Sequence, residues 1–218
     1  MKYRSKNLKI TCDGGGATGK STGAKLIAKK YNLSYLSSGL LYRYAGYVLL
    51  KHKPKKKIIF LKKIFNDLDY KKLNKINLHS PYISEQSAKI AKILKIRNIL
   101  KKYQKNFIKS NKGCVLEGRD ASTKILPNSD VKFFFICNLD TAAKRRYNEL
   151  RKFKKKINLS SVKKALKLRD NLDKKRKHSP LKKHKNAVVV NSGKLNKQAM
   201  VAKMSKYVDK ILIEKYGN

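Results

Sequence analysis

The feature that most constrains the fold of this chain is a glycine-rich run between a strand-like and a helix-like segment, Gly14-Gly15-Gly16-Ala17-Thr18-Gly19-Lys20-Ser21. The run fits G-x-x-x-x-G-K-[ST], the pattern of the phosphate-binding loop. Residues 8–12 alternate as in a strand, and residues 21–31 read as a helix. In this setting the loop N–H groups and the positive end of the helix attract phosphate oxygens. The sequence therefore predicts a nucleotide site in which Lys20 reaches the outer phosphates and the Ser21 hydroxyl binds Mg²⁺.

The length of the chain and its cysteines indicate how many domains it forms and in which cellular compartment it works. A chain of 218 residues can bury the core of one domain. No apolar run approaches the ~18 residues that a membrane span needs, and residues 1–6 carry charge without the apolar segment of a signal peptide. Cys12, Cys114 and Cys137 lie in apolar runs without metal-ligand spacing. We therefore expect a single cytoplasmic domain with reduced, buried cysteines.

The net charge of +43 is unusual for a chain of this length. A basic surface often indicates nucleic-acid binding. Here, however, the lysines are spread along the whole chain, without a basic tail or a stripe interleaved with aromatic residues. A solvated lysine surface needs no partner to be stable. We therefore expect no specific nucleic-acid partner, and only weak, salt-sensitive binding to RNA.

Short apolar runs alternate with helical segments along the chain. The strand candidates, bounded by Gly, Asn, Asp or Pro, are Leu8–Asp13, Ser34–Leu36, Cys114–Glu117, Val131–Cys137 and Ala187–Val190. Such runs are typical of parallel strands buried on both faces. The last helix would place on one face Met200, Met204, Tyr207, Val208, Ile211 and Leu212. The pattern predicts an α/β fold, a doubly wound five-stranded parallel sheet with flanking helices and with ligands at the carboxyl ends of its strands.

Arginine is informative because the chain has only nine arginines among its 56 basic residues. A chain that favours lysine is expected to keep arginine where a planar, bidentate donor is needed, above all on phosphate. Arg43 and Arg119 follow two of the predicted strands, so both would face the phosphate-binding loop. On a helix, Arg169, Asp173 and Arg176 would share one face. That face is equally compatible with a lid that closes over phosphates and with a row of salt bridges within the helix.

These motifs, in this order, resemble the bacterial cytidylate kinases, a family of P-loop nucleoside monophosphate kinases, from about Leu8 to the final helix. The matching residues are Asp13-Gly14, Gly19-Lys20-Ser21-Thr22, Ser38-Gly39, Tyr42-Arg43, Ile96-Arg97, Gly118-Arg119-Asp120, Arg145-Arg146, Arg169-Asp170, Asp173, Arg176 and Ser179-Pro180-Leu181. The phosphate-binding loop is shared by all P-loop proteins, whereas the remaining series is far narrower. The resemblance implies transfer of the γ-phosphoryl group of ATP, with Mg²⁺, to CMP or dCMP.

The resemblance also implies a role for each matching residue. The ATP site would comprise Gly14, Gly15, Gly16, Ala17, Thr18, Gly19, Lys20, Ser21, Thr22 and, on the donor side, Arg146. The CMP site would comprise Ser38 and Tyr42 in the acceptor pocket, Arg43 and Arg119 on the phosphate, Arg97 and Asp120 on the cytosine edge, Asp173 on the ribose, and Arg176. The catalytic cations would be Lys20, Arg119, Arg169 and Arg176. Because phosphoryl transfer depends on positioning and electrostatics, no general base is expected.

The implied organisation is one kinase domain over residues 1–218. Its core would be residues 1–36, 111–152 and 182–218, its acceptor-binding segment residues 37–110, and its lid residues 153–181. Within the acceptor segment, residues 44–78 read as helical rather than as a small sheet. Ala17 stands where relatives usually carry Gly, at a position that is normally free to take any backbone angle. Small kinases of this shape often work as monomers.

Two other functions remain open from the sequence alone. A different small-molecule P-loop kinase would act on AMP, shikimate or another nucleoside monophosphate, and would not need Arg97 and Asp120 as a base-reading pair. A nucleic-acid-binding GTPase or ATPase would use the positive surface, and RNA would stimulate its hydrolysis of nucleotide. Such a GTPase would also carry the guanine-reading motif Asn-Lys-x-Asp, which this sequence lacks.

Overall fold

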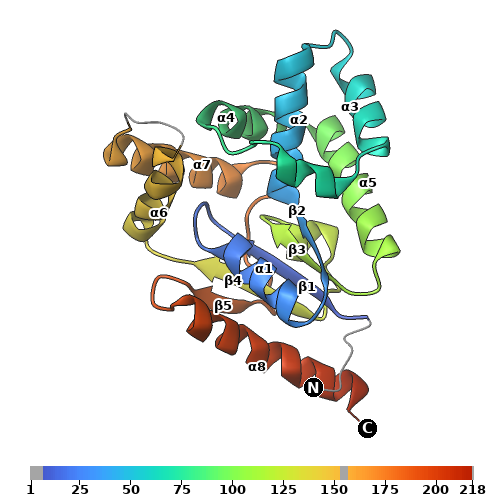
Figure 1. Ribbon diagram of the computed structural model, residues 1–218, viewed down its shortest axis with the longest axis vertical. Helices are drawn as coiled ribbons and strands as arrows, with labels where there is room; N and C mark the ends of the chain where they lie inside the picture. The colour runs from blue at the N-terminus through green and yellow to red at the C-terminus, as the bar shows by residue number, and fades with distance from the viewer. Residues whose placement is uncertain (1–6, 153–156, 218) are drawn as a thin grey trace.

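A five-stranded parallel sheet forms the centre of the molecule (Figure 1). In this computed structural model, which describes residues 7–152 and 157–217, the strands are β1 (Lys9–Gly14), β2 (Ser34–Ser37), β3 (Cys114–Gly118), β4 (Val131–Ile136) and β5 (Val188–Asn191). The order across the sheet is β2-β3-β1-β4-β5, and all paired strands are parallel. The five predicted strands and the doubly wound fold are therefore confirmed.

Helices surround this sheet. They are α1 (Lys20–Lys30), α2 (Ser38–His52), α3 (Lys57–Asn66), α4 (Pro81–Ile90), α5 (Leu94–Ser110), α6 (Leu139–Arg151), α7 (Leu159–Lys175) and α8 (Lys197–Tyr216). A 3-10 turn, η1 (Tyr70–Lys75), and a single π-helical turn, η2 (Ala121–Ile125), lie between them. None of the helices in the described ranges is both long enough and apolar enough to cross a membrane.

Two hydrophobic clusters meet at the sheet, and β3 contributes to both because successive side chains of a strand point to opposite faces. Val115 packs with residues of α1 and α8, whereas Cys114 and Leu116 pack with residues of α2 to α5. Helix α1 approaches β4 so closely that a Cβ on Gly23 would lie 2.6 Å from the Phe135 ring. This close packing fixes the start of α1, and with it the phosphate-binding loop, at the carboxyl end of β1.

Most of the predicted core positions are buried. On α8 the buried side chains are Met200, Met204, Val208 and Leu212. Tyr207, predicted on the same face, is 39% exposed, so that prediction is wrong. It lies at the edge of the apolar stripe, where a tyrosine can keep its hydroxyl in water. Cys12 and Cys114 are buried free thiols, whereas Cys137, one residue beyond β4, is only partly buried.

Residues 38–110 are helical throughout their regular elements, as predicted for residues 44–78. Ser37 caps α2, because its Oγ accepts a hydrogen bond from Leu40 N at 3.3 Å. The cap directs the first turn of α2 over the end of β3, where a Cβ on Gly118 would lie 2.5 Å from Ser38 Oγ. In Figure 1, α2 rises directly from the end of β2. The predicted domain bounds at residues 1, 153 and 218 lie outside the described residues.

Candidate active site

The loop between β1 and α1 lies at the carboxyl edge of the sheet, where β1 separates β3 from β4. A Cβ on Gly14 would lie 2.5 Å from the carbonyl oxygen of Phe135, so only glycine fits at the start of the loop. Ala17 has φ of 53°, in the left-handed region. For a residue with a Cβ, this conformation costs roughly 1–2 kcal/mol. Residue 17 thus adopts a backbone conformation that suits glycine, and as an alanine it does so under strain.

A chain of hydrogen bonds supports the loop from the side of β5. Ser192, just beyond β5, donates from Oγ to the Thr18 carbonyl at 2.7 Å. Arg145 of α6 holds Ser192 in turn, through Nη1 to Oγ at 2.9 Å and Nη2 to the carbonyl at 2.8 Å. Within the loop, Thr18 Oγ1 donates to the Gly15 carbonyl at 3.0 Å. The loop conformation is therefore maintained by side chains as well as by its own backbone.

Arg146 points in a different direction from Arg145. Its Nη2 donates to Ser84 Oγ at 3.2 Å and to the His79 carbonyl at 3.4 Å, both in the segment 37–110. Neighbouring residues on a helix point about 100° apart, which accounts for the different partners of the two adjacent arginines. The structure thus places Arg145 beside the phosphate-binding loop and Arg146, the residue predicted for the donor side, beside α4.

Lys20 is nearly buried, and its charge has a partner. Its Nζ donates to the Gly15 carbonyl at 3.1 Å and lies 3.4 Å from Glu117 Oε1. Burial lowers the pKa of Lys20 to about 8, although Glu117 acts against this shift. Glu117 also accepts hydrogen bonds from Ser37 Oγ at 2.5 Å and Tyr35 OH at 3.2 Å. Burial alone would raise the pKa of Glu117, but Lys20 and these hydroxyl donors lower it, so the carboxylate is ionised.

The remaining loop and helix residues predicted for the site lie on the first turns of α1 and α2. Ser21 and Thr22 are exposed, and the Ser21 side chain contributes to lowering the pKa of Glu117. Ser38 is buried against Gly118. Sequence reasoning gave Glu117 no role. The available signal was a charged residue that ends an otherwise apolar strand beside β1.

Three arginines, Arg43, Arg119 and Arg169, lie near enough to Lys20 to lower its pKa. Burial and the neighbouring Arg146 lower the pKa of Arg43 to about 10. Burial, together with Arg119 and Arg43, lowers the pKa of Arg169 to about 9. The Nε atoms of Arg43 and Arg169 are buried without a hydrogen-bond partner among the described residues. Mutual repulsion and unsatisfied donors in one place indicate a binding site for anions.

Helix α7 directs two acids at the loop and at Arg119. Asp170 accepts a hydrogen bond from Gly16 N with both oxygens, at 2.9 and 3.2 Å. Arg119 Nη1 lies 3.2 Å from Asp170 Oδ1, and its Nε lies 3.1 Å from Asp173 Oδ2. Arg119 Nη1 also donates to the Gly14 carbonyl at 2.8 Å. Asp170 therefore binds both the loop N–H of Gly16 and the Arg119 guanidinium, and Asp173 binds the same guanidinium.

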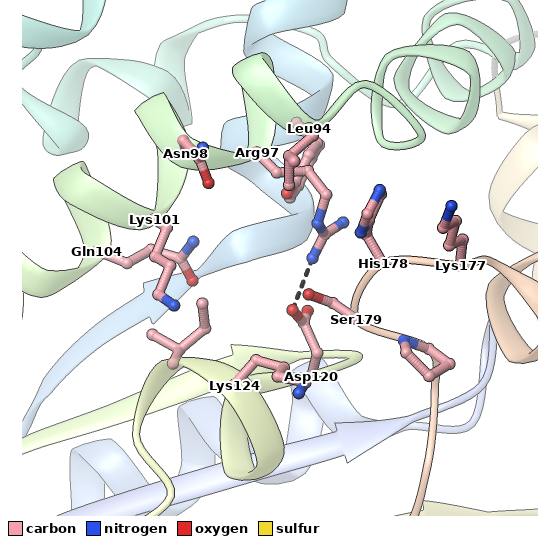
Figure 2. Close-up of a pocket in the computed structure, with 13 residues that line it drawn as sticks. Leu94, Arg97, Asn98, Lys101, Gln104, Asp120, Lys124, Lys177, His178 and Ser179 are labelled. Atoms are coloured by element: carbon pink, nitrogen blue, oxygen red, sulfur yellow. Dashed lines mark hydrogen bonds and ion pairs between the residues drawn. The ribbon is translucent and has the colours of Figure 1, made fainter.

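A pocket with a volume of about 280 Å³ is lined by Asp120, the residue after Arg119, and by Arg97 and Tyr42. Figure 2 shows Arg97 of α5 pointing at Asp120, with Ser179 beside them. Arg97 Nη2 lies 2.6 Å from Asp120 Oδ2, and each side chain is only 6% exposed. The Arg97 guanidinium also lies 5.5 Å from the centre of the Tyr42 ring. The pocket thus presents a fixed pair of donors and acceptors beside an aromatic ring.

Arg176 connects α7 to this pocket through Asp173 and Asp120. It ends α7 as its C-cap, and its Nη1 lies 3.2 Å from Asp173 Oδ1. Its Nη2 lies 3.6 Å from Asp120 Oδ1. The salt bridge expected on the Arg169–Arg176 face is therefore present between Asp173 and Arg176, and Asp170 of the same helix contacts the loop at Gly16.

A phosphate-binding loop on a doubly wound parallel sheet, with buried arginines and an acid of α7 beside it, is the arrangement of a P-loop kinase. The fold is similar to that of an uncharacterized protein from Eubacterium ventriosum, with a TM-score of 0.55 and 15% identity, covering 93% of this chain and 99% of that one. It is also similar to shikimate kinase from Bacteroides thetaiotaomicron, with a TM-score of 0.50 and 11% identity, covering 93% and 98%.

Sequence comparison identifies the family within this class. The cytidylate kinase family model matches residues 10–210. The chain is 38% identical over 208 residues to the cytidylate kinase of Bartonella tribocorum, covering 93% of this chain and 95% of that one. It is 36% identical over 216 residues to that of Fusobacterium nucleatum, covering 94% and 99%. The chain therefore belongs to the cytidylate kinase family and is a transferase, which confirms the resemblance found from its motifs.

Proposed function

We propose that this protein transfers the γ-phosphoryl group of ATP to CMP or dCMP, giving ADP and CDP or dCDP. The observation that carries the proposal is the buried Arg97–Asp120 pair beside the arginine cluster that faces the phosphate-binding loop. The pair suits a base with both donor and acceptor groups, and the cluster suits the phosphates of two substrates. Arg119 and Asp120 are adjacent, so one loop can contact the phosphate and the base of the same molecule.

On the donor side, residues Gly14 to Thr22 would hold the phosphates of ATP, and Lys20 would bind the outer ones. Ser21 and Glu117 fit Mg²⁺, because a hydroxyl and an ionised carboxylate are the hard oxygen ligands that this ion prefers. Bound there, Mg²⁺ would neutralise charge on the phosphates. Arg146, which the resemblance assigns to the donor side, hydrogen bonds instead to Ser84 and to the His79 carbonyl of the acceptor segment.

On the acceptor side, Arg43 and Arg119 would bind the CMP phosphate. The transferring group spreads its charge over three oxygens, and fixed cations stabilise that charge. Lys20, Arg119, Arg169 and Arg176 would supply these cations, and the unpartnered Nε atoms of Arg43 and Arg169 would gain phosphate partners. The attacking atom is an already ionised phosphate oxygen, so the step needs no general base.

Base recognition would rest on Asp120 and Arg97. The cytosine amino group can donate to Asp120, and the ring acceptors can receive from Arg97. Tyr42 and Ser38 would shape the pocket, and Asp173 would accept a hydrogen bond from the ribose. UMP has no amino group, so Asp120 would lose a donor in a buried site, which reduces binding roughly tenfold to a hundredfold.

We propose the same organisation that the motifs imply. Residues 37–110 would bind the acceptor, residues 153–181 would form the lid, and residues 1–36, 111–152 and 182–218 would form the core of a single domain. The protein would work as a monomer in the cytoplasm, without a specific nucleic-acid partner. The free thiols of Cys12 and Cys114 are compatible with a reducing compartment.

A coupled phosphotransfer assay with Mg-ATP tests the proposal, with CMP, dCMP, UMP and AMP offered separately. We expect rapid ADP formation with CMP and dCMP only, and its loss in Arg119→Ala. Arg151→Ala is the matched control, because Arg151 is an exposed arginine whose guanidinium packs on Tyr147. The control should retain wild-type rates.

Two results would contradict the proposal in different ways. Preferential turnover of AMP or UMP would mean that Arg97 and Asp120 do not select cytosine. Slow hydrolysis that is indifferent to every acceptor, and is stimulated by RNA, would replace the kinase with a nucleic-acid-dependent nucleotidase.

A further inference from the structure

Asp13 is a fully buried carboxylate at the end of β1, directly before the phosphate-binding loop. Its Oδ1 accepts a hydrogen bond from Ala121 N at 2.9 Å. Its Oδ2 accepts from Ser122 N at 2.7 Å and from Ser122 Oγ at 2.6 Å. All three donors belong to the first two residues of η2, more than 100 positions away in the sequence.

The turn that Asp13 holds begins immediately after Arg119 and Asp120. The first N–H groups of any helical turn lack partners within the turn. In η2 the bonds that close the turn come later, from Lys124 N to the Asp120 carbonyl and from Leu126 N to the Ala121 carbonyl. Asp13 therefore accepts hydrogen bonds from the N–H groups of Ala121 and Ser122, which have no partner within the turn. These two residues directly follow Asp120 in the chain.

We propose that Asp13, together with the Ser122 hydroxyl, is a positioning residue for recognition of the acceptor nucleotide. It fixes the backbone that follows Arg119 and Asp120, and so sets where their side chains meet the phosphate and the base. This inference rests on the proposed function. Asp13 does not itself contact a substrate, because its carboxylate has no exposed surface and both of its oxygens are bound to η2.

A carboxylate is the side chain that suits this position. Three donors converge on it, so a group with two acceptor oxygens and no hydrogen of its own is needed. An amide would direct an NH₂ group at one of the backbone N–H groups and leave that donor unsatisfied in a buried site. Burial raises the pKa of Asp13 to about 6, while the Ser122 and Ala121 bonds act against the shift. The group is therefore ionised at neutral pH.

The structure supplies a matched control on the same strand. Thr11 is buried two residues before Asp13, and its Oγ1 shares a hydrogen bond with Ser129 Oγ at 3.0 Å. Ser129 lies beyond the turn, in the connection to β4. Thr11→Val therefore removes a buried hydrogen bond from β1 without altering the backbone next to Arg119.

The experiment compares the wild type, Asp13→Asn, Ser122→Ala and Thr11→Val. It measures KM for CMP and for ATP, kcat, the ratio of CMP to UMP turnover, and Tm. A buried N–H left unpaired corresponds to roughly a tenfold change in affinity. We expect Asp13→Asn to raise KM for CMP about tenfold and to narrow the preference for CMP over UMP by a similar factor, with KM for ATP within about twofold.

Ser122→Ala keeps both backbone bonds to Asp13 and should raise KM for CMP by only about threefold, which provides a milder test if Asp13→Asn folds poorly. Thr11→Val should lower Tm and leave both KM values and the CMP preference unchanged. Equal effects of Asp13→Asn on the two KM values, or a loss of Tm without any change in KM, would overturn the inference. A wild type that phosphorylates no monophosphate would instead overturn the proposed function, and the inference with it.

Discussion

Replacing Asp170 by asparagine should tighten the binding of Mg-ATP, because this carboxylate of α7 occupies donors that a phosphate would use. Both of its oxygens accept from Gly16 N, at 2.9 and 3.2 Å, and Oδ1 lies 3.2 Å from Arg119 Nη1. A Cβ on Gly15 would lie 2.7 Å from Asp170 Oδ2, so the carboxylate rests directly on the loop. A phosphate oxygen and this carboxylate would compete for the same N–H group, so ATP binding must displace Asp170.

The size of the effect follows from the charge that the substitution removes. A hydrogen bond to a charged group contributes about 1.5–3 kcal/mol, against about 0.5–1.5 kcal/mol for a neutral one. Asparagine keeps one acceptor oxygen, so the variant loses only the difference, about 1 kcal/mol. The Asp170 side chain is 23% exposed, and screening by solvent keeps the difference from being larger. About 1 kcal/mol corresponds to roughly a fivefold lower Kd.

Calorimetric titration of Mg-ATP, without an acceptor, measures this Kd directly. Asp140→Asn is the matched control, because it removes the same charge from α6, where Asp140 pairs with Lys163 of α7. We expect Asp170→Asn to bind Mg-ATP about fivefold more tightly than the wild type, and Asp140→Asn to bind it equally well. A Kd for Asp170→Asn at or above that of the wild type would refute the reasoning, since the carboxylate would then not compete with phosphate.

Three further predictions concern the loop, its lysine and the base pocket. Ala17→Gly should raise the free energy of unfolding, measured in urea, by about 0.5–1 kcal/mol. The substitution relieves the left-handed strain at residue 17, and this gain exceeds the cost of the greater conformational entropy that glycine has in the unfolded chain. The pKa of Lys20 is lowered to about 8, so a profile of kcat/KM for ATP should fall as pH rises through about 8, where the amine loses its charge. Asp120→Asn should reduce the preference for CMP over UMP at least tenfold in a competition assay, because the amide, unlike the carboxylate, does not depend on the cytosine amino group as its hydrogen-bond donor.

The sheet and the loop could be predicted because their signals are local. Each strand is a short apolar run with polar or glycine residues at its ends, so its existence depends on a few consecutive residues. The close packing of Gly23 on Phe135 could not be predicted in the same way. It depends on how near one helix comes to one strand, and no periodicity in the sequence encodes that distance.

The arginines of the site could be predicted from their rarity, but their partners could not. Asp170 binds the backbone of Gly16 across 154 positions, and Asp13 binds Ser122 across 109. These contacts exist only after the sheet has brought the ends of β1 and β3 together and α7 has closed over them. The motif likewise could not predict which of Arg145 and Arg146 lies beside the loop, because this depends on the rotation of α6 about its axis.

The distribution of acids offers a signal that complements the arginines. Only 13 residues of this chain are acidic, and they include Asp13, Glu117, Asp120, Asp170 and Asp173, all of which lie in the site. Burying cations without counter-charges costs free energy, so a phosphate-binding cluster of cations needs acids that hold its lysine and arginines in place. In a chain with a net charge of +43, an acid at the end of an apolar strand or within a lid is therefore as informative as an arginine. This reasoning singles out Glu117 and Asp170, which the motifs alone left without a role.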